Sequence, residues 1–293
     1  MKRLIKMELK KAICSKFFLL GVLLLTLFSV LSAVYMIENR INYNPNTIEK
    51  YILTDGNYKT NPDVSLYSFF NSWLGGEELS LAGSLFFSLM PVGCAIPYAW
   101  SYYTEKKSGY LKNVASRENK RKYILAKTLA VFVSGALTVL IPMVLNVFLV
   151  SAFVPDVMPF AGYTLYNHIY FGDLWVDFYY TFPYLYVLFY LLLDVLYGGI
   201  YALLSLAVSC FYQNLLSVLF LPFITMVAVN YLKGLFDQLY MSNVIYKINP
   251  MGFLHSLSSG GTRAWWIILL VTVLLLATSL LIIFIKGFKD EIF

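Results

Sequence analysis

Long stretches without charge constrain this chain more than any other feature of its sequence. A helix that crosses roughly 30 Å of hydrocarbon needs about 20 apolar residues, because each residue rises about 1.5 Å. Intervals of at least this length are 17–37, 79–104, 128–155, 178–232 and 264–285, and the fourth contains a single charge, Asp194. The chain is therefore predicted to be an all-α integral membrane protein.

The interval 178–232 is too long for one crossing, and the polar triplet Tyr212-Gln213-Asn214 divides it. Two helices in this interval bring the prediction to six transmembrane helices. They are expected at about 17–37, 79–103, 128–154, 182–211, 215–232 and 264–285, within one transmembrane domain over 1–293.

Composition agrees with this class. Hydrophobic residues make up 59% of the chain and charged residues 13%, whereas soluble proteins average about 45–50% apolar and about 25% charged residues. A water-soluble surface and a nucleic-acid partner are therefore not expected, and the lipid bilayer is.

The charges predict the orientation. The segments 1–16, 104–127 and 286–293 hold 16 of the 22 basic residues and five of the 16 acidic ones. The loops 38–78, 155–181 and 233–263 hold six basic and ten acidic residues. Because loops rich in Lys and Arg stay on the cytoplasmic side, a multi-pass protein of the cell membrane is expected, with both termini in the cytoplasm.

The first 16 residues have the pattern of an amphipathic interfacial helix. Apolar side chains fall on one side and basic ones on another, which suits a helix lying on the inner leaflet. The apolar side holds Met1, Leu4, Ile5, Leu9, Ala12 and Ile13, and the basic side holds Lys2, Arg3, Lys6 and Lys10. The alternative is a topology signal with no further role.

The loop 104–127 carries a short stripe formed by Lys107, Tyr110, Leu111 and Val114 if its first half is helical. Charges surround this stripe, so it is suited to docking in a groove of another protein. The alternative is again a basic loop that only fixes topology.

Several residues of this loop carry a family resemblance. They are Glu105, Gly109, Leu111, Ser116-Arg117 and Lys127. In this order they resemble the first cytoplasmic loop of type-2 ATP-binding-cassette (ABC) transporter permeases, although Tyr110 stands where that family often has a small hydroxyl residue. The basic N-terminus, the six spans and the outer segments extend the resemblance over nearly the whole chain.

The resemblance implies an assembly. Two permease subunits, identical or different, would pair above two copies of a cytoplasmic ATPase subunit, and the loop would be the coupling helix. Its coupling residues would be Glu105, Lys107, Gly109, Tyr110, Leu111, Val114 and Arg117. The same analogy places short re-entrant helices within 234–262.

The chain is not expected to be an enzyme. It contains no G-x-x-x-x-G-K-[ST] phosphate loop, the motif that cradles nucleotide phosphates, and no metal-ligand spacing. Catalytic, metal-binding and cofactor-binding residues are therefore not predicted, and ATP and Mg are expected on the partner ATPase.

Asp194 is the charged residue inside a predicted span. A carboxylate in mid-membrane costs about 2.5–3.5 kcal/mol on insertion scales, so it should face protein or water and find a partner. Asp194 is either a protonated or hydrogen-bonded acid that fixes helix packing, or a proton-relay or cation-binding group.

Aromatic residues crowd the segment 160–186. Tyr and Trp collect at the level of the lipid headgroups, so an interfacial belt is one interpretation. The other is an outer aromatic surface for an amphipathic substrate, formed by Tyr170, Trp175, Tyr179 and Tyr180.

The leading functional hypothesis is the permease subunit of a bacterial ABC exporter. A composition rich in Lys, Asn, Ile and Tyr is typical of low-GC bacteria, and amphipathic toxin or antimicrobial peptides are the expected substrates. The alternatives are an ion-coupled carrier or channel that works without ATP, and an intramembrane enzyme. The enzyme is disfavoured because an intramembrane aspartyl protease needs two catalytic acids, whereas only Asp194 falls inside a predicted span.

Overall fold

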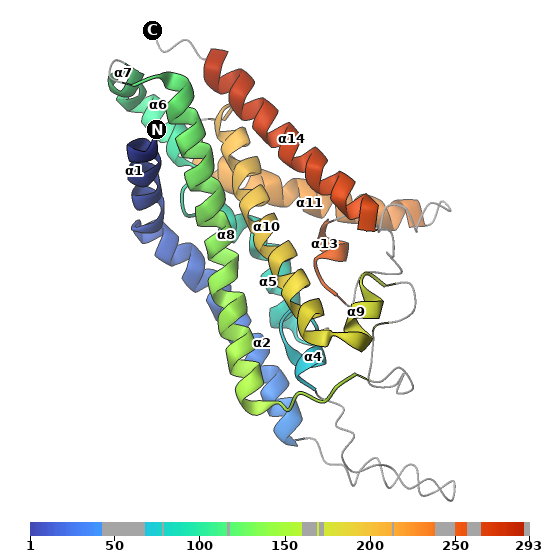
Figure 1. Ribbon diagram of the computed structural model, residues 1–293. Coiled ribbons are helices and arrows are strands. Elements are labelled where there is room, and N and C mark those ends of the chain that lie inside the picture. Colours follow the sequence, from blue (N-terminus) through green and yellow to red (C-terminus); the bar gives the residue numbers. More distant parts are fainter. Residues whose placement is uncertain are drawn as a thin grey trace, which may run out of the picture.

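The computed structural model describes residues 1–42, 68–77, 79–115, 118–159, 169, 173–212, 214–237, 250–256 and 265–289. These residues form helices and turns, with no strand among them (Figure 1). The helices are Lys2–Ile13 (α1), Lys16–Asn42 (α2), Phe69–Ser72 (α4), Leu81–Ala95 (α5), Ser101–Lys107 (α6), Tyr110–Ala115 (α7), Lys120–Phe153 (α8), Val176–Thr181 (α9), Pro183–Ser209 (α10), Leu215–Asp237 (α11), Pro250–Phe253 (α13) and Trp265–Lys289 (α14).

Four of these helices are long and apolar enough to cross a membrane: Lys16–Asn42, Lys120–Phe153, Pro183–Ser209 and Trp265–Gly287. The apolar stretches Leu81–Ala95 and Leu215–Tyr231 are shorter and coincide with the second and fifth predicted spans. The all-α membrane architecture agrees with the sequence. A crossing by α5 or by α11 stays a prediction.

The second predicted span, 79–103, is not one continuous helix. α5 ends at Ala95, a turn covers 96–100, and α6 begins at Ser101. Pro97 has no N–H to donate to the carbonyl of Gly93, so the helical hydrogen-bond ladder is interrupted there. The third predicted span also begins earlier than expected, at Lys120, where the Asn119 side chain accepts a hydrogen bond from the backbone N–H of Arg121 at 2.9 Å.

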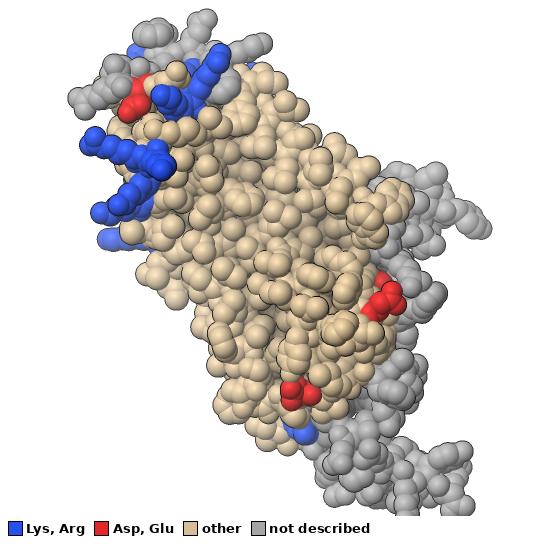
Figure 2. All heavy atoms as spheres, viewed as in Figure 1, with Lys and Arg blue, Asp and Glu red and all other residues tan. Residues whose placement is uncertain are grey.

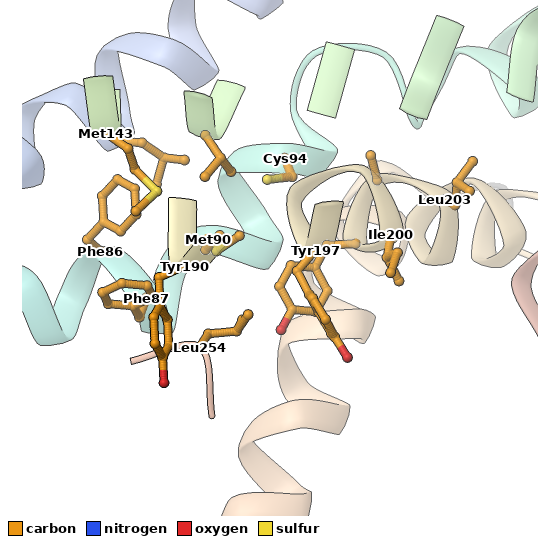
Figure 3. Close-up of a cluster of buried hydrophobic side chains, with 14 of the residues drawn as sticks. Phe86, Phe87, Met90, Cys94, Met143, Tyr190, Tyr197, Ile200, Leu203 and Leu254 are labelled. Carbon is orange, nitrogen blue, oxygen red and sulfur yellow. The ribbon is translucent and has the colours of Figure 1, made fainter. Parts of the chain in front are cut away.

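α8 lies at the centre of the packing, where it contacts α1, α2 and α10. α10 in turn contacts α5, α11 and α14, and α11 runs at a steep angle to α8 and α10 (Figure 1). Side chains of α5, α8 and α10 meet Leu254, which follows α13, in the buried cluster of Figure 3. This cluster is the hydrophobic core against which these helices pack.

The ends of the helices fall into two groups. The N-terminus, α6, α7 and the C-terminal end of α14 lie at one end of the bundle, and α4 lies toward the other, with the end of α2 (Figure 1). The segments that the charge tally assigns to the cytoplasm therefore gather at one end.

Candidate functional site

Lys and Arg side chains gather at the end of the molecule that contains α1, α6 and α7, and the middle of the visible face carries none (Figure 2). Such a band without charge is what a lipid-facing surface requires. The charged end is where the sequence predicts contact with a partner, and its interior contains an unusual set of buried charges.

Glu8 of α1 is fully buried, although it belongs to a basic helix. It lies between Leu4 and Ala12 on the face that α1 turns toward the bundle. The hydroxyl of Tyr98 donates a hydrogen bond to Glu8 Oε2 at 2.7 Å. Lys11 Nζ lies 3.0 Å from Glu8 Oε1, and Lys127 Nζ lies 3.6 Å from Glu8 Oε2.

Lys127 of α8 is equally enclosed, with 1% of its surface exposed. Its ammonium pairs with the Glu105 carboxylate and donates to the hydroxyl of Tyr123 at 3.0 Å. Tyr123 itself donates to Glu105. Lys127 Nζ also lies 4.8 Å from the centre of the Tyr98 ring, a distance at which cation–π attraction operates.

Lys11 extends the network to the loop. Its Nζ donates to the hydroxyl of Tyr110 at 3.2 Å and lies 3.8 Å from Glu105 Oε1. We call these seven residues the charged junction: Glu8, Lys11, Tyr98, Glu105, Tyr110, Tyr123 and Lys127. It joins α1, the turn after α5, α6, α7 and α8, and its two acids balance its two lysines.

The charges of the junction support one another. Burial alone raises the pKa of Glu8, but the nearby Lys127, the Tyr98 hydroxyl and Lys11 together lower it below 4.5. Burial alone lowers the pKa of Lys11, but Glu8, Tyr110 and Glu105 raise it above 10.5. Glu8 and Lys11 are therefore both charged over the physiological pH range.

The junction is suited to mechanical linkage rather than to bond chemistry. Every charge has an opposite charge or a hydroxyl as partner, so neither acid is left as a free base. Among the described residues no group of three His, Cys, Asp or Glu side chains could hold a metal ion. Its contacts link α1 and the loop to the start of α8.

The predicted coupling loop 104–127 contains the end of α6, all of α7 and the start of α8, and Gly109 lies between α6 and α7. Gly109 has a φ of +73°, a left-handed conformation that glycine adopts without strain. A Cβ at this position would meet no atom of the described residues within 4 Å. Backbone conformation, rather than crowding, therefore favours glycine here.

The predicted docking stripe is partly turned inward. Leu111 is 5% exposed and belongs to the core, and Val114 packs against that core. Leu111 is therefore not available to a partner in this conformation, whereas Lys107 and Lys112 are exposed. Arg117 lies outside the described residues, and the coupling role of the loop stays a prediction.

Asp194, in the middle of α10, is fully buried, and neither of its carboxylate oxygens has a hydrogen-bond partner in the part of the chain that the structure describes. The predicted burial is present, but a partner from the described protein is not. Of the aromatic residues predicted to form an outer surface, Tyr179 is buried, Trp175 and Tyr180 are half-buried, and Tyr170 lies outside the described residues. Tyr179 therefore belongs to the interior, where it packs edge-on against Tyr186.

The opposite end of the bundle contains another buried acid, Glu77. Ser32 donates to it at 2.9 Å from α2, and the backbone N–H of Ser80 donates at 2.8 Å. Burial raises the pKa of Glu77. Burial also lowers the pKa of His255 to about 4, against a smaller opposing effect of the Glu77 carbonyl. These contacts fix the segment around α13 to the start of α5.

Sequence reasoning missed Glu8 and Glu77 as buried groups. A signal for Glu8 was present, because it lies four residues from both Leu4 and Ala12 and so interrupts the apolar face of α1. The pairing of Glu8 with Tyr98 and Lys127 spans about 90 and about 120 positions of sequence, so no local pattern shows it.

Comparison of the chain with protein-family models, with curated proteins and with solved structures finds no match. The features of the chain that bear on its function are the charged junction, the long apolar helices and the buried Asp194 of α10.

Proposed function

We propose that this chain is the permease subunit of an ATP-driven exporter, coupled to a separate cytoplasmic ATPase through the loop 104–127. The observation that supports this most directly is the charged junction. It ties the loop to α1 and to the long helix α8, so a displacement of α6 and α7 is transmitted to an element that is long enough to cross the bilayer.

The partner binds at the exposed side of the loop. Lys107 and Lys112 point away from the core, while Leu111 anchors the loop from beneath. A complementary acidic surface on the ATPase fits these lysines better than the apolar groove expected from sequence. Amphipathic peptides remain the proposed substrates, on the strength of the family resemblance alone.

The test is purification of the tagged chain from its native membranes, followed by assay of ATP hydrolysis and transport. The paired substitution Lys107→Asp with Lys112→Asp should leave membrane levels unchanged while ATPase binding and transport fall at least about tenfold, which corresponds to roughly 1.4 kcal/mol. Lys122→Asp, an exposed lysine at the start of α8, is the matched control. Full ATPase binding by the paired variant would refute this docking surface, and ATP hydrolysis by the isolated chain would refute the separate-ATPase model.

A second candidate is an ion-coupled carrier, which the carboxyl of Asp194 favours because it has no hydrogen-bond partner among the residues that the structure describes. The two candidates differ in their energy source. Transport into proteoliposomes that contain only this chain, driven by an ion gradient without ATP, would select the carrier.

A further inference from the structure

One face of α10 carries polar side chains along most of its length. We call this face the α10 seam. Its residues are Tyr186, Tyr190, Asp194, Tyr197, Tyr201 and Ser205. Their spacing of three and four residues places them on the same side of a helix, and each is at most 1% exposed. Tyr190 and Tyr197 extend from α10 in the same general direction (Figure 3).

The seam is short of hydrogen-bond partners. Among the described residues, neither carboxylate oxygen of Asp194 has one, and the hydroxyl of Ser205 has none. The hydroxyls of Tyr186 and Tyr190 face each other, and that of Tyr186 also faces Ser256, but neither pair reaches normal hydrogen-bond geometry. Tyr197 differs, because its hydroxyl lies 2.9 Å from Thr272 Oγ1 of α14. Buried polar atoms in proteins are nearly always hydrogen-bonded, so several orphans on one helix face indicate bound water or an ion.

The surroundings of Asp194 argue against a fixed counter-ion. The charged residues of α8 fall within 120–127 and those of α14 within 286–289, far along each helix from the centre, and α5 has none. The titratable groups around Asp194 include four tyrosines of α10 and Cys94 on α5, and Asp173 lies near Tyr190. The tyrosines are Tyr186, Tyr190, Tyr197 and Tyr201. An ionised carboxylate without a cation would carry a large desolvation cost, which a proton removes.

The seam leads from Asp194 toward α9. The Tyr190 ring lies between Tyr186, with ring centres 4.9 Å apart, and Trp175, with ring centres 5.4 Å apart. Trp175 has a φ of +57°, which is strained for a bulky residue, and its contacts with Phe189 and Tyr190 hold it there. Tyrosine hydroxyls both donate and accept, so they can carry a hydrogen-bonded chain of water.

We propose that Asp194 is a proton-binding site, a neutral carboxylic acid whose proton exchanges with solvent through waters bound along the α10 seam at Tyr190 and Tyr186. The site holds a proton and no metal. It does not depend on the proposed exporter role, because the proton site exists in the isolated chain whether or not an ATPase binds.

The experiment uses the full-length chain in lipid nanodiscs and infrared difference spectroscopy. The spectrum should contain a C=O component of a protonated carboxyl that disappears in Asp194→Asn and shifts on transfer to D₂O. In Tyr190→Phe the same component should remain, but its deuterium exchange should be several-fold slower because a hydroxyl of the water chain is missing. Tyr197→Phe is the matched control. In this variant the carboxyl proton should exchange at the wild-type rate, since the Tyr197 hydroxyl is already hydrogen-bonded to Thr272.

Two results would overturn the proposal. One is a spectrum without any carboxyl component that depends on position 194, which would make Asp194 an ionised group. The other is equal exchange rates in the wild type and Tyr190→Phe. If Asp194→Asn does not fold, Asp194→Glu serves instead, because it retains the acid and should move the component rather than abolish it. These outcomes are independent of ATPase binding, so they separate the proton site from the exporter proposal.

Discussion

At the scale of single residues, the charged junction depends on Glu8. This carboxylate neutralises Lys127, which has almost no access to water, and it orients Lys11 toward Tyr110. Burying a charge is unfavourable unless it is paired, so the loss of one partner affects the charges that remain. A charged pair of this kind specifies where α1 docks rather than adding much net stability.

Replacing Glu8 with Gln should destabilise the folded chain by roughly 3 kcal/mol, because Glu105 is then the one counter-charge of Lys127 among the described residues. The measurement is denaturant unfolding in detergent micelles. Glu118→Gln is the matched control, since Glu118 is exposed and its change should stay within about 0.5 kcal/mol. Equal stability of the Glu8 variant and the wild type would show that Lys127 does not need this partner.

The same pair of proteins tests the pH dependence. Folding lowers the pKa of Glu8 below 4.5, so its contribution is complete above pH 4.5 and is lost as the pH falls through the lowered pKa. The difference in the free energy of unfolding between the wild type and Glu8→Gln should therefore disappear as the pH falls through this acidic range. A difference that persists unchanged at lower pH would contradict the assignment.

At the scale of helices, the sequence predicts the long apolar helices well, because backbone hydrogen bonds in apolar surroundings must be satisfied within the helix itself. For α2, α8, α10 and α14, the majority of the helix ends lie within a few residues of the ends predicted from the uncharged intervals. They do not locate the break at Pro97 or the early start of α8, because both depend on local backbone chemistry within an apolar or basic run. They also do not show which helices touch.

The contact between α8 and α10 is set by small residues. A Cβ on Gly135 would lie 2.5 Å from the Cβ of Ala202 and 2.7 Å from the carbonyl oxygen of Gly198. Neither atom can move without moving α10. Close helix approach through such residues is a common way for membrane helices to associate.

Gly135→Ala should therefore destabilise the chain by about 1–3 kcal/mol, through overpacking of this contact. Thermal unfolding in a fixed detergent measures the effect. Gly287→Ala in α14 is the control, because a Cβ there comes within 3 Å only of the flexible end of Ile124, at 2.9 Å. Similar melting temperatures for the two variants would mean that α8 and α10 can separate at little cost.

At the scale of the whole molecule, the charge tally and the fold agree on which segments share an end. The sequence assigns 1–16, 104–127 and 286–293 to one side of the membrane, and Figure 1 places the N-terminus, α6, α7 and the end of α14 together. The candidate site was predictable only in part. Glu105, Tyr110 and Lys127 were identified from the loop 104–127, whereas their partners Glu8 and Lys11 belong to α1, far away in sequence, and only packing brings them together.

The orientation of this arrangement in the cell membrane can be tested with single cysteines. Cys14, Cys94 and Cys210 are first replaced, because Cys14 is exposed. A cysteine at Asn113, on the exposed side of α7, should not react with an impermeant thiol reagent in intact cells, since the basic loop remains in the cytoplasm. A cysteine at Met158, which is 59% exposed beyond the end of α8, should react. Both should react after the membrane is permeabilised, which is the control for accessibility.

The additional positions Asn57, Tyr166 and Phe293 lie outside the described residues, and the sequence predicts the first two outside the cell and the last inside. Reaction at position 113 in intact cells would place the charged junction on the outer side, where no cytoplasmic ATPase could reach it, and the exporter proposal would fall with the orientation.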